Sequence, residues 1–257
     1  MRLITITSGK GGVGKTTTSI NLGAALNSFG KEVIIVDANL TTPNVGLHLG
    51  APIVPVNLNH VLSGKADVAE AIYEHESGTK IVPSSLSVKE LKKLNYKKFK
   101  SSAEKLSKMA DYVIIDSAAG LGDEATCAME SADDLIIVTN PEIPAVTDAL
   151  KTLKLAEDMN KDVKGVIVTR VRGGKDEMAV SNIREMLDLP ILGVVPEDKN
   201  VRHSVRNKDA LLHLKPYSKA SRAYKQIAAK IANIDYQEPS LLTRVFGKWL
   251  TNSASNF

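Results

Sequence analysis

A glycine-rich stretch near the start of the chain restricts the possible folds more than any other feature. Residues 9–16 match the pattern G-x-x-x-x-G-K-[ST], with Lys15 and Thr16 at its last two positions. An apolar run at 3–7 precedes the stretch, and a helical pattern at 16–29 follows it. This order predicts a phosphate-binding loop, because backbone N–H groups that turn inward and the N-terminus of the helix both attract anionic oxygens.

The rest of the chain repeats the alternation of a short apolar run with a helical pattern. Continuous apolar runs are typical of strands that are covered on both faces. The alternation predicts an α/β fold with a doubly wound, mostly parallel sheet and helices on both faces. The expected strands are residues 3–7, 33–36, 112–115, 135–138, 166–168 and 191–195, with 81–82 as a short further one. The expected helices after 16–29 are residues 88–109, 123–131, 144–159, 176–188 and 218–233.

Composition favours a soluble protein with a sizeable core. The chain is 43% hydrophobic and 24% charged, and 33 basic against 29 acidic side chains give a net charge of +4. This mild basicity permits anionic partners without selecting one. The apolar runs all fall short of the roughly 18 residues that a membrane span needs. A single cysteine, Cys127, excludes an internal disulfide, so we expect a cytoplasmic, reduced protein. Because the apolar runs are too short for a membrane span, we expect any membrane contact to be peripheral.

The glycine-rich loop supplies the first candidate ligands. Lys15 can reach the β- and γ-phosphates of a nucleotide, and the Thr16 hydroxyl can ligate Mg²⁺. ATP and Mg²⁺ are therefore the expected cofactors. The expected nucleotide-binding residues of the loop are Gly11, Gly12, Val13, Gly14, Lys15, Thr16 and Thr17.

Lys10 is a second lysine inside the loop, which the basic motif does not require. The sequence G-K-G-G-V-G-K-T-T at 9–17 resembles the deviant Walker A family, the MinD and ParA ATPases with NifH-like relatives. The resemblance extends in order over residues 1–234 and is greatest to archaeal and bacterial MinD-like ATPases that position the cell-division site. It implies an ATP-bound homodimer in which Lys10 reaches the partner's nucleotide, where a cation supplied in trans stabilises the transferred phosphoryl group.

Two aspartates stand where expected strands end. Asp37 follows the strand at 33–36, and Asp116 closes the pattern Val-Ile-Ile-Asp, which is typical of a Walker B carboxylate. A carboxylate in this position can hold Mg²⁺ through its water shell. An aspartate at a strand end is otherwise often a helix N-cap, but the phosphate-binding loop favours the metal role. The expected metal ligands are Thr16, Asp37 and Asp116.

The resemblance assigns further residues to the nucleotide. The segment from Asp116 to Gly120 resembles the MinD switch segment, in which the glycine amide senses the γ-phosphate. Glu142 is expected to contact the ribose across the dimer. The family's adenine pocket follows the fifth and sixth strands, and parallel-sheet topology independently places a ligand at the carboxyl ends of strands. The residues expected in that pocket are Thr169, Arg170, Pro196, Glu197 and Asp198.

Asn39 departs from the family pattern. The family usually has a second aspartate two residues after the first, where it orients the attacking water. An amide keeps the size and the hydrogen bonds of that aspartate but lacks its charge and basicity. We therefore expect slow ATP hydrolysis by Lys10, Lys15, Asp37 and Asn39, and accumulation of the ATP-bound dimer. The alternative is a neutral variant with residual activity.

The segment from 235 to 257 begins with a compositional break at Asp235–Pro239 and differs from the domain before it. It predicts a linker and a short amphipathic helix with lysine and arginine beside its apolar face, a pattern typical of a peripheral membrane anchor. It also resembles the membrane-targeting helix of MinD, which implies attachment to the inner face of the cell membrane. A tail packed on its own domain or on a partner is the alternative. The expected membrane-contacting residues are Leu241, Leu242, Val245, Phe246, Trp249 and Leu250.

A lysine-rich stretch at 89–108 supports a different function, that of a ParA-like DNA-partition ATPase that binds nucleic acid non-specifically as an ATP dimer. Such stretches are also typical of solvated helix faces. Iron–sulfur carriers share the loop but need cysteine ligands, and Cys127 alone argues against them. The preferred prediction is a MinD-like ATPase switch that dimerises on ATP, attaches reversibly to a membrane and positions a protein partner.

Overall fold

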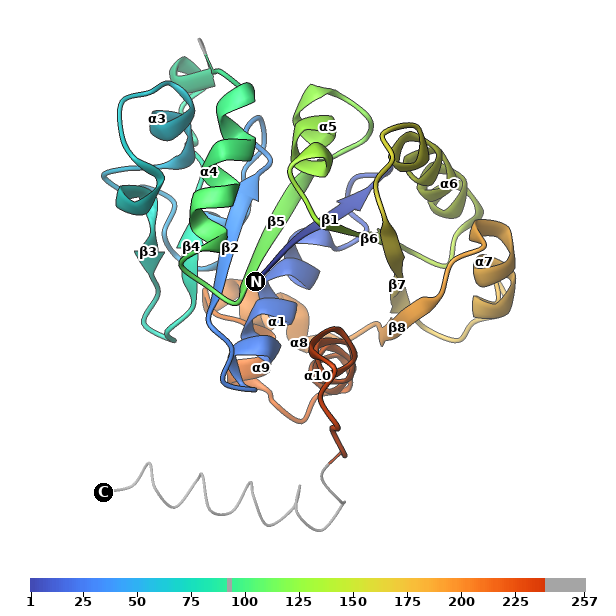
Figure 1. Cartoon of the computed structure of the whole chain (residues 1–257). Coiled ribbons are helices and arrows are strands. Elements are labelled where there is room, and N and C mark those ends of the chain that lie inside the picture. The colour runs from blue at the N-terminus through green and yellow to red at the C-terminus, as the bar shows by residue number, and fades with distance from the viewer. Residues whose placement is uncertain (92–93, 239–257) are drawn as a thin grey trace, which may run out of the picture.

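An eight-stranded sheet runs through the computed structural model, which describes residues 1–91 and 94–238 (Figure 1). The strand order is β3-β4-β2-β5-β1-β6-β7-β8, and all neighbours pair in parallel except the antiparallel pair β3–β4. The doubly wound parallel sheet is thereby confirmed. The strands are β1 (Arg2–Ser8), β2 (Val33–Ala38), β3 (Tyr73–Glu74), β4 (Lys80–Val82), β5 (Tyr112–Ala119), β6 (Asp134–Thr139), β7 (Val163–Val171) and β8 (Ile191–Pro196).

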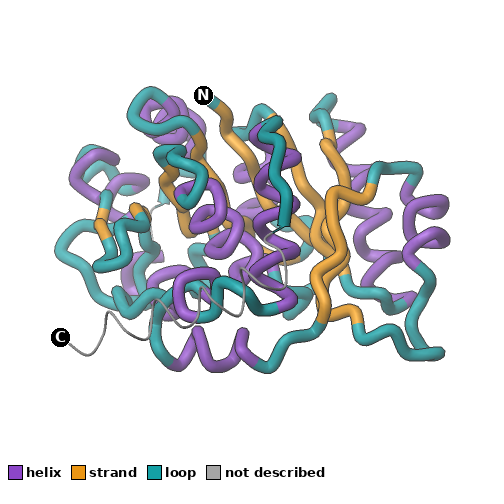
Figure 2. Tube along the Cα trace, turned by 90° about the horizontal axis from the view of Figure 1, so that it is seen from below, coloured by secondary structure: helices purple, strands orange, loops and turns teal. Residues whose placement is uncertain are grey.

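Helices cover both faces of this sheet, as Figure 2 shows from below. The helices α1, α9 and α10 pack on one face, and α3 to α7 pack on the other. The longer helices are α1 (Lys15–Asn27), α4 (Lys97–Ser107), α5 (Asp123–Glu130), α6 (Ile143–Asp158), α7 (Val180–Leu187), α8 (Asn200–Arg206) and α10 (Lys219–Ala232). The short ones are α2 (Val45–His48), α3 (Leu58–Leu62), α9 (Leu211–Leu214) and the 3₁₀ turns η1 (Val68–Ala71) and η2 (Val88–Leu91).

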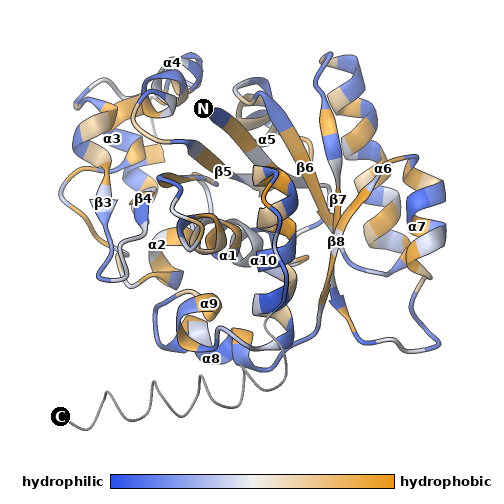
Figure 3. Ribbon diagram, turned by 60° about the horizontal axis from the view of Figure 1, so that its bottom comes forward, coloured by the Kyte–Doolittle hydropathy of each residue, from blue (hydrophilic) through white to orange (hydrophobic). Residues whose placement is uncertain are grey.

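Successive side chains of the central strands enter opposite layers. On β5, Ile114 joins the core beneath α1 and α10, whereas Val113 and Ile115 join the core beneath α4. All three are fully buried. This explains why the apolar runs are continuous rather than alternating, because both faces of the strand are covered. Figure 3 shows hydrophilic and hydrophobic residues together along α10, as a helix with one face on the sheet and one in solvent requires.

The prediction of a single helix at 88–109 is wrong. The segment is divided into η2 and α4, and residues 94–96 are not helical. Asn95 explains the new start, because its side-chain oxygen accepts the N–H of Lys97 at 3.1 Å and its carbonyl accepts that of Lys98 at 3.0 Å. The exposed two-residue edge strand β3 was not expected, since it carries no apolar run.

The sheet topology fixes the position of a ligand site. β1 lies between β5 and β6, and the chain winds outward from it in both directions. The loops that leave β1 therefore open a crevice at the carboxyl ends of the central strands. Among the described residues, the helices are all too short or too polar to cross a membrane. The predicted tail helix, with its six membrane-contacting residues, lies outside the described residues.

Candidate functional site

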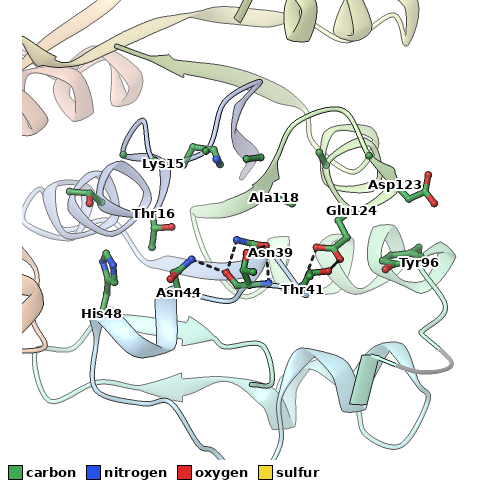
Figure 4. A pocket seen from close by; sticks show the side chains of 18 of the residues that line it. Lys15, Thr16, Asn39, Thr41, Asn44, His48, Tyr96, Ala118, Asp123 and Glu124 are labelled. Carbon is green, nitrogen blue, oxygen red and sulfur yellow. Dashed lines mark hydrogen bonds between the residues drawn. The ribbon is translucent and has the colours of Figure 1, made fainter. Parts of the chain in front are cut away.

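The glycine-rich loop joins β1 to α1 at this crevice. Gly12 and Gly14 adopt φ angles of 77° and 97°, which side chains rarely tolerate. Gly14 is the N-cap of α1 and has no side chain to cover the first N–H groups, so these remain available to an anion. The loop borders a cavity of about 730 Å³ (Figure 4). Predicted residues on its wall are Gly11, Gly12, Gly14, Lys15, Thr16, Thr17, Asn39 and Arg170.

Lys15 is held in the loop by Ser8. Its Nζ donates to the Ser8 Oγ at 2.9 Å, and the Ser8 hydroxyl donates to the Lys10 carbonyl at 2.8 Å. Burial lowers the pKa of Lys15, and the Asp116 carboxylate partly offsets this effect. Ser8 was not predicted as a site residue, although it directly precedes the loop. The contact keeps Lys15 beside the place where phosphate oxygens would lie.

Asp37 and Asp116 are brought together by strand pairing, because they are register partners on β2 and β5. Asp116 accepts the hydroxyls of Thr16 at 2.6 Å and Ser19 at 3.0 Å. Asp37 accepts the backbone N–H groups of Asn44 and Val45, each at 2.9 Å. Ser19 could have been expected, since it lies three residues after Thr16 on the same helix face.

The predicted metal ligands fit a Mg²⁺ ion. Burial raises the pKa of Asp116 to about 6, and it raises the pKa of Asp37 well above the ordinary value, with the Asp116 charge adding to the effect. A divalent cation beside the two buried carboxylates would oppose both shifts. Within the described part of the chain, His, Cys, Asp and Glu side chains form no cluster of three that could hold a metal alone. A Mg²⁺ ion held by these residues would keep water and phosphate oxygens among its ligands.

Lys10 and Glu142, both predicted to act across a dimer, contact each other within one chain. The Lys10 Nζ lies 3.2 Å from the Glu142 Oε2, and the two side chains are 39% and 56% exposed. A pair this exposed is weak and can exchange partners. Gly120, at φ 86°, donates its N–H to the Ser8 carbonyl at 3.0 Å. The predicted contact with a γ-phosphate would therefore require this bond to break.

Asn39 is bound to its own loop. Its Oδ1 accepts the Thr42 N–H at 3.2 Å and the Thr42 hydroxyl at 3.0 Å, and its Nδ2 donates to the Thr42 carbonyl at 2.7 Å. Figure 4 shows these bonds on the wall of the cavity, near Thr16. The side chain thus borders the expected site of chemistry, but its amide serves the local turn.

The predicted adenine residues converge on a second cavity, of about 420 Å³, lined by Thr169, Arg170, Pro196, Glu197 and Asp198. Gly14, Thr17 and Arg170 border both this cavity and the larger one. Arg170 has a left-handed φ of 56°, which is uncommon outside glycine and is often found at functional sites.

Two of these residues also support the loops around the second cavity. The Thr169 hydroxyl donates to the Val13 carbonyl at 2.5 Å, and the Asp198 carboxylate accepts the Asn200 N–H at 2.9 Å. Tyr224 lines the cavity from α10 and was not predicted.

Cys127 and the lysines of α4, which bear on the alternative functions, lie on two different helices. The lysines of α4 face away from its buried residues Phe99, Ala103 and Leu106, and Lys105 pairs with Asp67 at 2.6 Å. Cys127 is half-buried, and burial together with the nearby Glu130 raises its pKa to about 11. One cysteine per chain supplies two thiolates to a dimer, fewer than the four that usually hold an iron–sulfur cluster.

Comparison with known proteins agrees with this geometry. Residues 4–211 match the family described as the CobQ/CobB/MinD/ParA nucleotide binding domain. An uncharacterized ATP-binding protein of Methanocaldococcus jannaschii is 40% identical over 234 residues, which cover 91% of this chain and 89% of that protein. The septum site-determining protein MinD of Synechocystis is 34% identical over 91% of this chain and 90% of its own length.

A solved structure extends the likeness to the fold. The septum site-determining protein MinD of Pyrococcus horikoshii, complexed with Mg-ADP, superposes with a TM-score of 0.85 at 33% identity. The match covers 90% of this chain and 95% of that one. The chain therefore belongs to the CobQ/CobB/MinD/ParA family of nucleotide-binding proteins.

Proposed function

We propose that this protein is a MinD-like ATPase switch that binds Mg-ATP, dimerises face to face, and associates reversibly with a membrane to position a protein partner. The observation that carries the proposal is that Lys15 and Thr16 line one cavity at the phosphate-binding loop, while the Thr16 hydroxyl donates to Asp116 and strand pairing places Asp37 beside Asp116. The Mg-ADP bound to the similar MinD of Pyrococcus horikoshii supports ATP and Mg²⁺ as the cofactors.

The loop would bind the triphosphate through its backbone N–H groups and the side chain of Lys15. Backbone N–H groups from Gly12 to Thr16 cradle the phosphates, and Lys15 leaves Ser8 for their β- and γ-oxygens. Thr16, Asp37 and Asp116 would hold Mg²⁺, which neutralises charge on the phosphates. The second cavity, next to Arg170, takes the adenine.

Dimerisation would convert a weak internal contact into a catalytic one. Lys10 and Glu142 are both exposed and pair with each other in the single chain. In the dimer, Lys10 reaches the partner's γ-phosphate and Glu142 the partner's ribose. A cation placed in trans stabilises the charge that develops on the phosphoryl group, so hydrolysis depends on assembly.

The first prediction tests nucleotide binding and assembly together. The full chain should change from monomer to dimer when ATP and Mg²⁺ are added, as measured by light scattering. Lys15→Ala should abolish binding of a fluorescent ATP analogue and dimerisation, because the β- and γ-phosphates lose their cation. Lys10→Ala should retain nucleotide binding but lose hydrolysis, which separates the two lysines. An unchanged mass with ADP, with ATP and without nucleotide would contradict the proposal.

A ParA-like partition ATPase is the second candidate function. The observation that favours it is the group of exposed lysines on α4 and at its C-cap, which are Lys97, Lys98, Lys100, Lys105 and Lys108. A mobility assay with non-specific duplex DNA distinguishes the two functions. ATP-dependent DNA binding that weakens steeply with salt, without vesicle binding, would favour partition.

A further inference from the structure

The water that attacks a γ-phosphate needs an orienting group, and Asn39 is poorly suited to this task. Both acceptor positions of its Oδ1 are filled by Thr42, and its Nδ2 donates to the same residue. An amide also cannot accept a proton at neutral pH. A carboxylate elsewhere on the cavity wall is therefore the group to look for.

Glu124 places such a carboxylate on the wall of the same cavity. Asp123 and Glu124 are the only carboxylates among the described residues that line it. Glu124 belongs to the first turn of α5, the helix that follows the switch segment after Asp116. Its Oε2 accepts the Thr41 N–H at 3.2 Å, and its Oε1 accepts the Thr41 hydroxyl. Two donors from one residue hold the carboxylate in one orientation, two residues along the loop from Asn39.

The other titratable groups on this wall are less well placed. Figure 4 shows Asp123 beyond Glu124, on the side away from Asn39 and Thr16. His48 lies at the opposite end of the view, beyond Asn44, and burial lowers the pKa of its imidazole. Glu124 alone combines a position beside the Asn39 loop with a carboxylate that is fixed by two hydrogen bonds.

We propose that Glu124 is a catalytic residue that orients the attacking water and accepts its proton, in place of the carboxylate that position 39 lacks. The inference rests on the proposed ATPase function. The water oxygen forms a bond to the γ-phosphorus, and the bond from that phosphorus to the β–γ bridging oxygen breaks, leaving its electron pair on ADP. One water proton passes to Glu124, which then releases it to solvent, so the products are ADP, phosphate and a proton.

Replacement of the charge alone tests this assignment. Glu124→Gln keeps the size of the side chain and an oxygen that can accept the Thr41 N–H, so the contact between the two loops is retained. Single-turnover hydrolysis of Mg-ATP by the full chain should slow by about 10-fold or more, in line with loss of one general base. Affinity for a fluorescent ATP analogue and ATP-dependent dimerisation should remain within about twofold, since Glu124 does not hold the ground-state phosphates.

Two further variants distinguish a catalytic role of Glu124 from a general effect of charge and from a structural role. Asp123→Asn removes the neighbouring negative charge from the same helix end and should leave turnover within about twofold. In the Asn39→Asp background, Glu124→Gln should cost much less turnover than it costs in the unmodified chain, because a carboxylate then stands on the adjacent loop. A purely structural role of Glu124 would cost the same factor in both backgrounds and would overturn the assignment.

The outcomes separate this assignment from the proposed function. Full turnover by Glu124→Gln, or an equal loss in Asp123→Asn, would overturn the role of Glu124 while the ATPase function stands. Absence of turnover both in the unmodified chain and in Asn39→Asp would overturn the proposed function, and the assignment with it.

Discussion

At the scale of single residues, the chemistry of the site depends on what each polar side chain already contacts. Ser8 keeps Lys15 at the place proposed for the phosphates, and Thr16 and Ser19 keep Asp116 in place. Apart from the proposed shift of Lys15 from Ser8 to the phosphates, these side chains are already in place, so the proposed nucleotide would require little rearrangement. Asn39 differs from them, because its hydrogen bonds stabilise a turn instead of facing the ligand.

Asn39→Asp should change turnover in the otherwise unmodified chain. An aspartate can still accept the Thr42 N–H and hydroxyl, but it cannot donate to the Thr42 carbonyl, so the side chain is freed from one of its three bonds. The negative charge would then be available to orient the attacking water. In the proposed dimer interface bulk solvent is excluded, so electrostatic effects are large. We expect single-turnover hydrolysis to rise by about 10²-fold or more, with ATP affinity nearly unchanged.

The comparison requires equal dimer occupancy for both proteins, because assembly also limits the rate. Equal rates would show that position 39 does not handle the water. Glu124 would then be the remaining carboxylate on the cavity wall beside that loop.

At the scale of elements, the phosphate-binding loop is positioned by close backbone packing as well as by its own glycines. A Cβ added to Gly9 would lie 2.2 Å from the backbone carbonyl oxygen of Asp148 in α6. The loop therefore rests directly on that helix, which also begins beside Glu142. Only glycine allows this approach, because the atom it would meet belongs to the backbone and not to a flexible side chain.

Gly9→Ala should lower the free energy of unfolding by about 1–3 kcal/mol, as overpacking of a tight contact does. Urea denaturation followed by circular dichroism measures the change. Gly174→Ala is the matched control, because a Cβ there meets no heavy atom within 4 Å and its φ is not left-handed. It should shift stability by less than about 0.5 kcal/mol. Equal effects of the two substitutions would show that a Cβ at position 9 can be accommodated beside the backbone of α6.

The sequence predicted those elements whose apolar runs are long enough to be buried on both faces. All the expected strands were found, because short runs of β-branched residues such as Ile114 and Ile115 favour strands that are buried on both faces. The division between η2 and α4 was missed, since it depends on local hydrogen bonds to Asn95 within a stretch that reads as helical throughout. Short elements such as β3 depend on tertiary pairing and carry no periodic signal.

The candidate site was predictable where the motif fixes the geometry and unpredictable where distant loops meet. The loop, Asp37 and Asp116 follow from motif and strand order. The contact between Thr41 and Glu124 joins residues 83 positions apart, and it is visible only after β2 and β5 are paired. The contact between Thr169 and Val13 likewise joins β7 to the loop.

At the scale of the whole molecule, the start of the tail is attached to the domain. The Glu238 carboxylate accepts hydrogen bonds from the Arg222 Nη1 and the Gln226 Nε2, each at 2.6 Å, on α10. The ring of Tyr236 packs edge-on against Phe29, which lies two residues beyond the end of α1, with a centroid distance of 5.4 Å. The contacts of the domain thus continue to Glu238, and each copy in a dimer would present its tail from a fixed point.

Deletion of residues 239–257 should leave ATP binding intact and abolish co-sedimentation with vesicles of anionic phospholipid. One short amphipathic helix binds lipid weakly, but two tails attached to one dimer act at a high effective concentration. Vesicle binding of the full chain should therefore be stronger with ATP than with ADP. Trp249→Glu should act like the deletion, because it places a charge on the apolar face of the predicted helix.

Thr251→Glu is the matched control for the charge, since position 251 is about 160° around an ideal helix from position 249 and away from the predicted apolar face. It adds the same negative charge to the same segment, so general repulsion from anionic lipid would weaken both variants equally. A selective loss in Trp249→Glu would instead require insertion of the apolar face. If the truncated chain still sediments with vesicles in ATP, the membrane contact must lie on the domain itself. The exposed lysines of α4 would then be the surface to replace next, because they are the cations that anionic headgroups would meet.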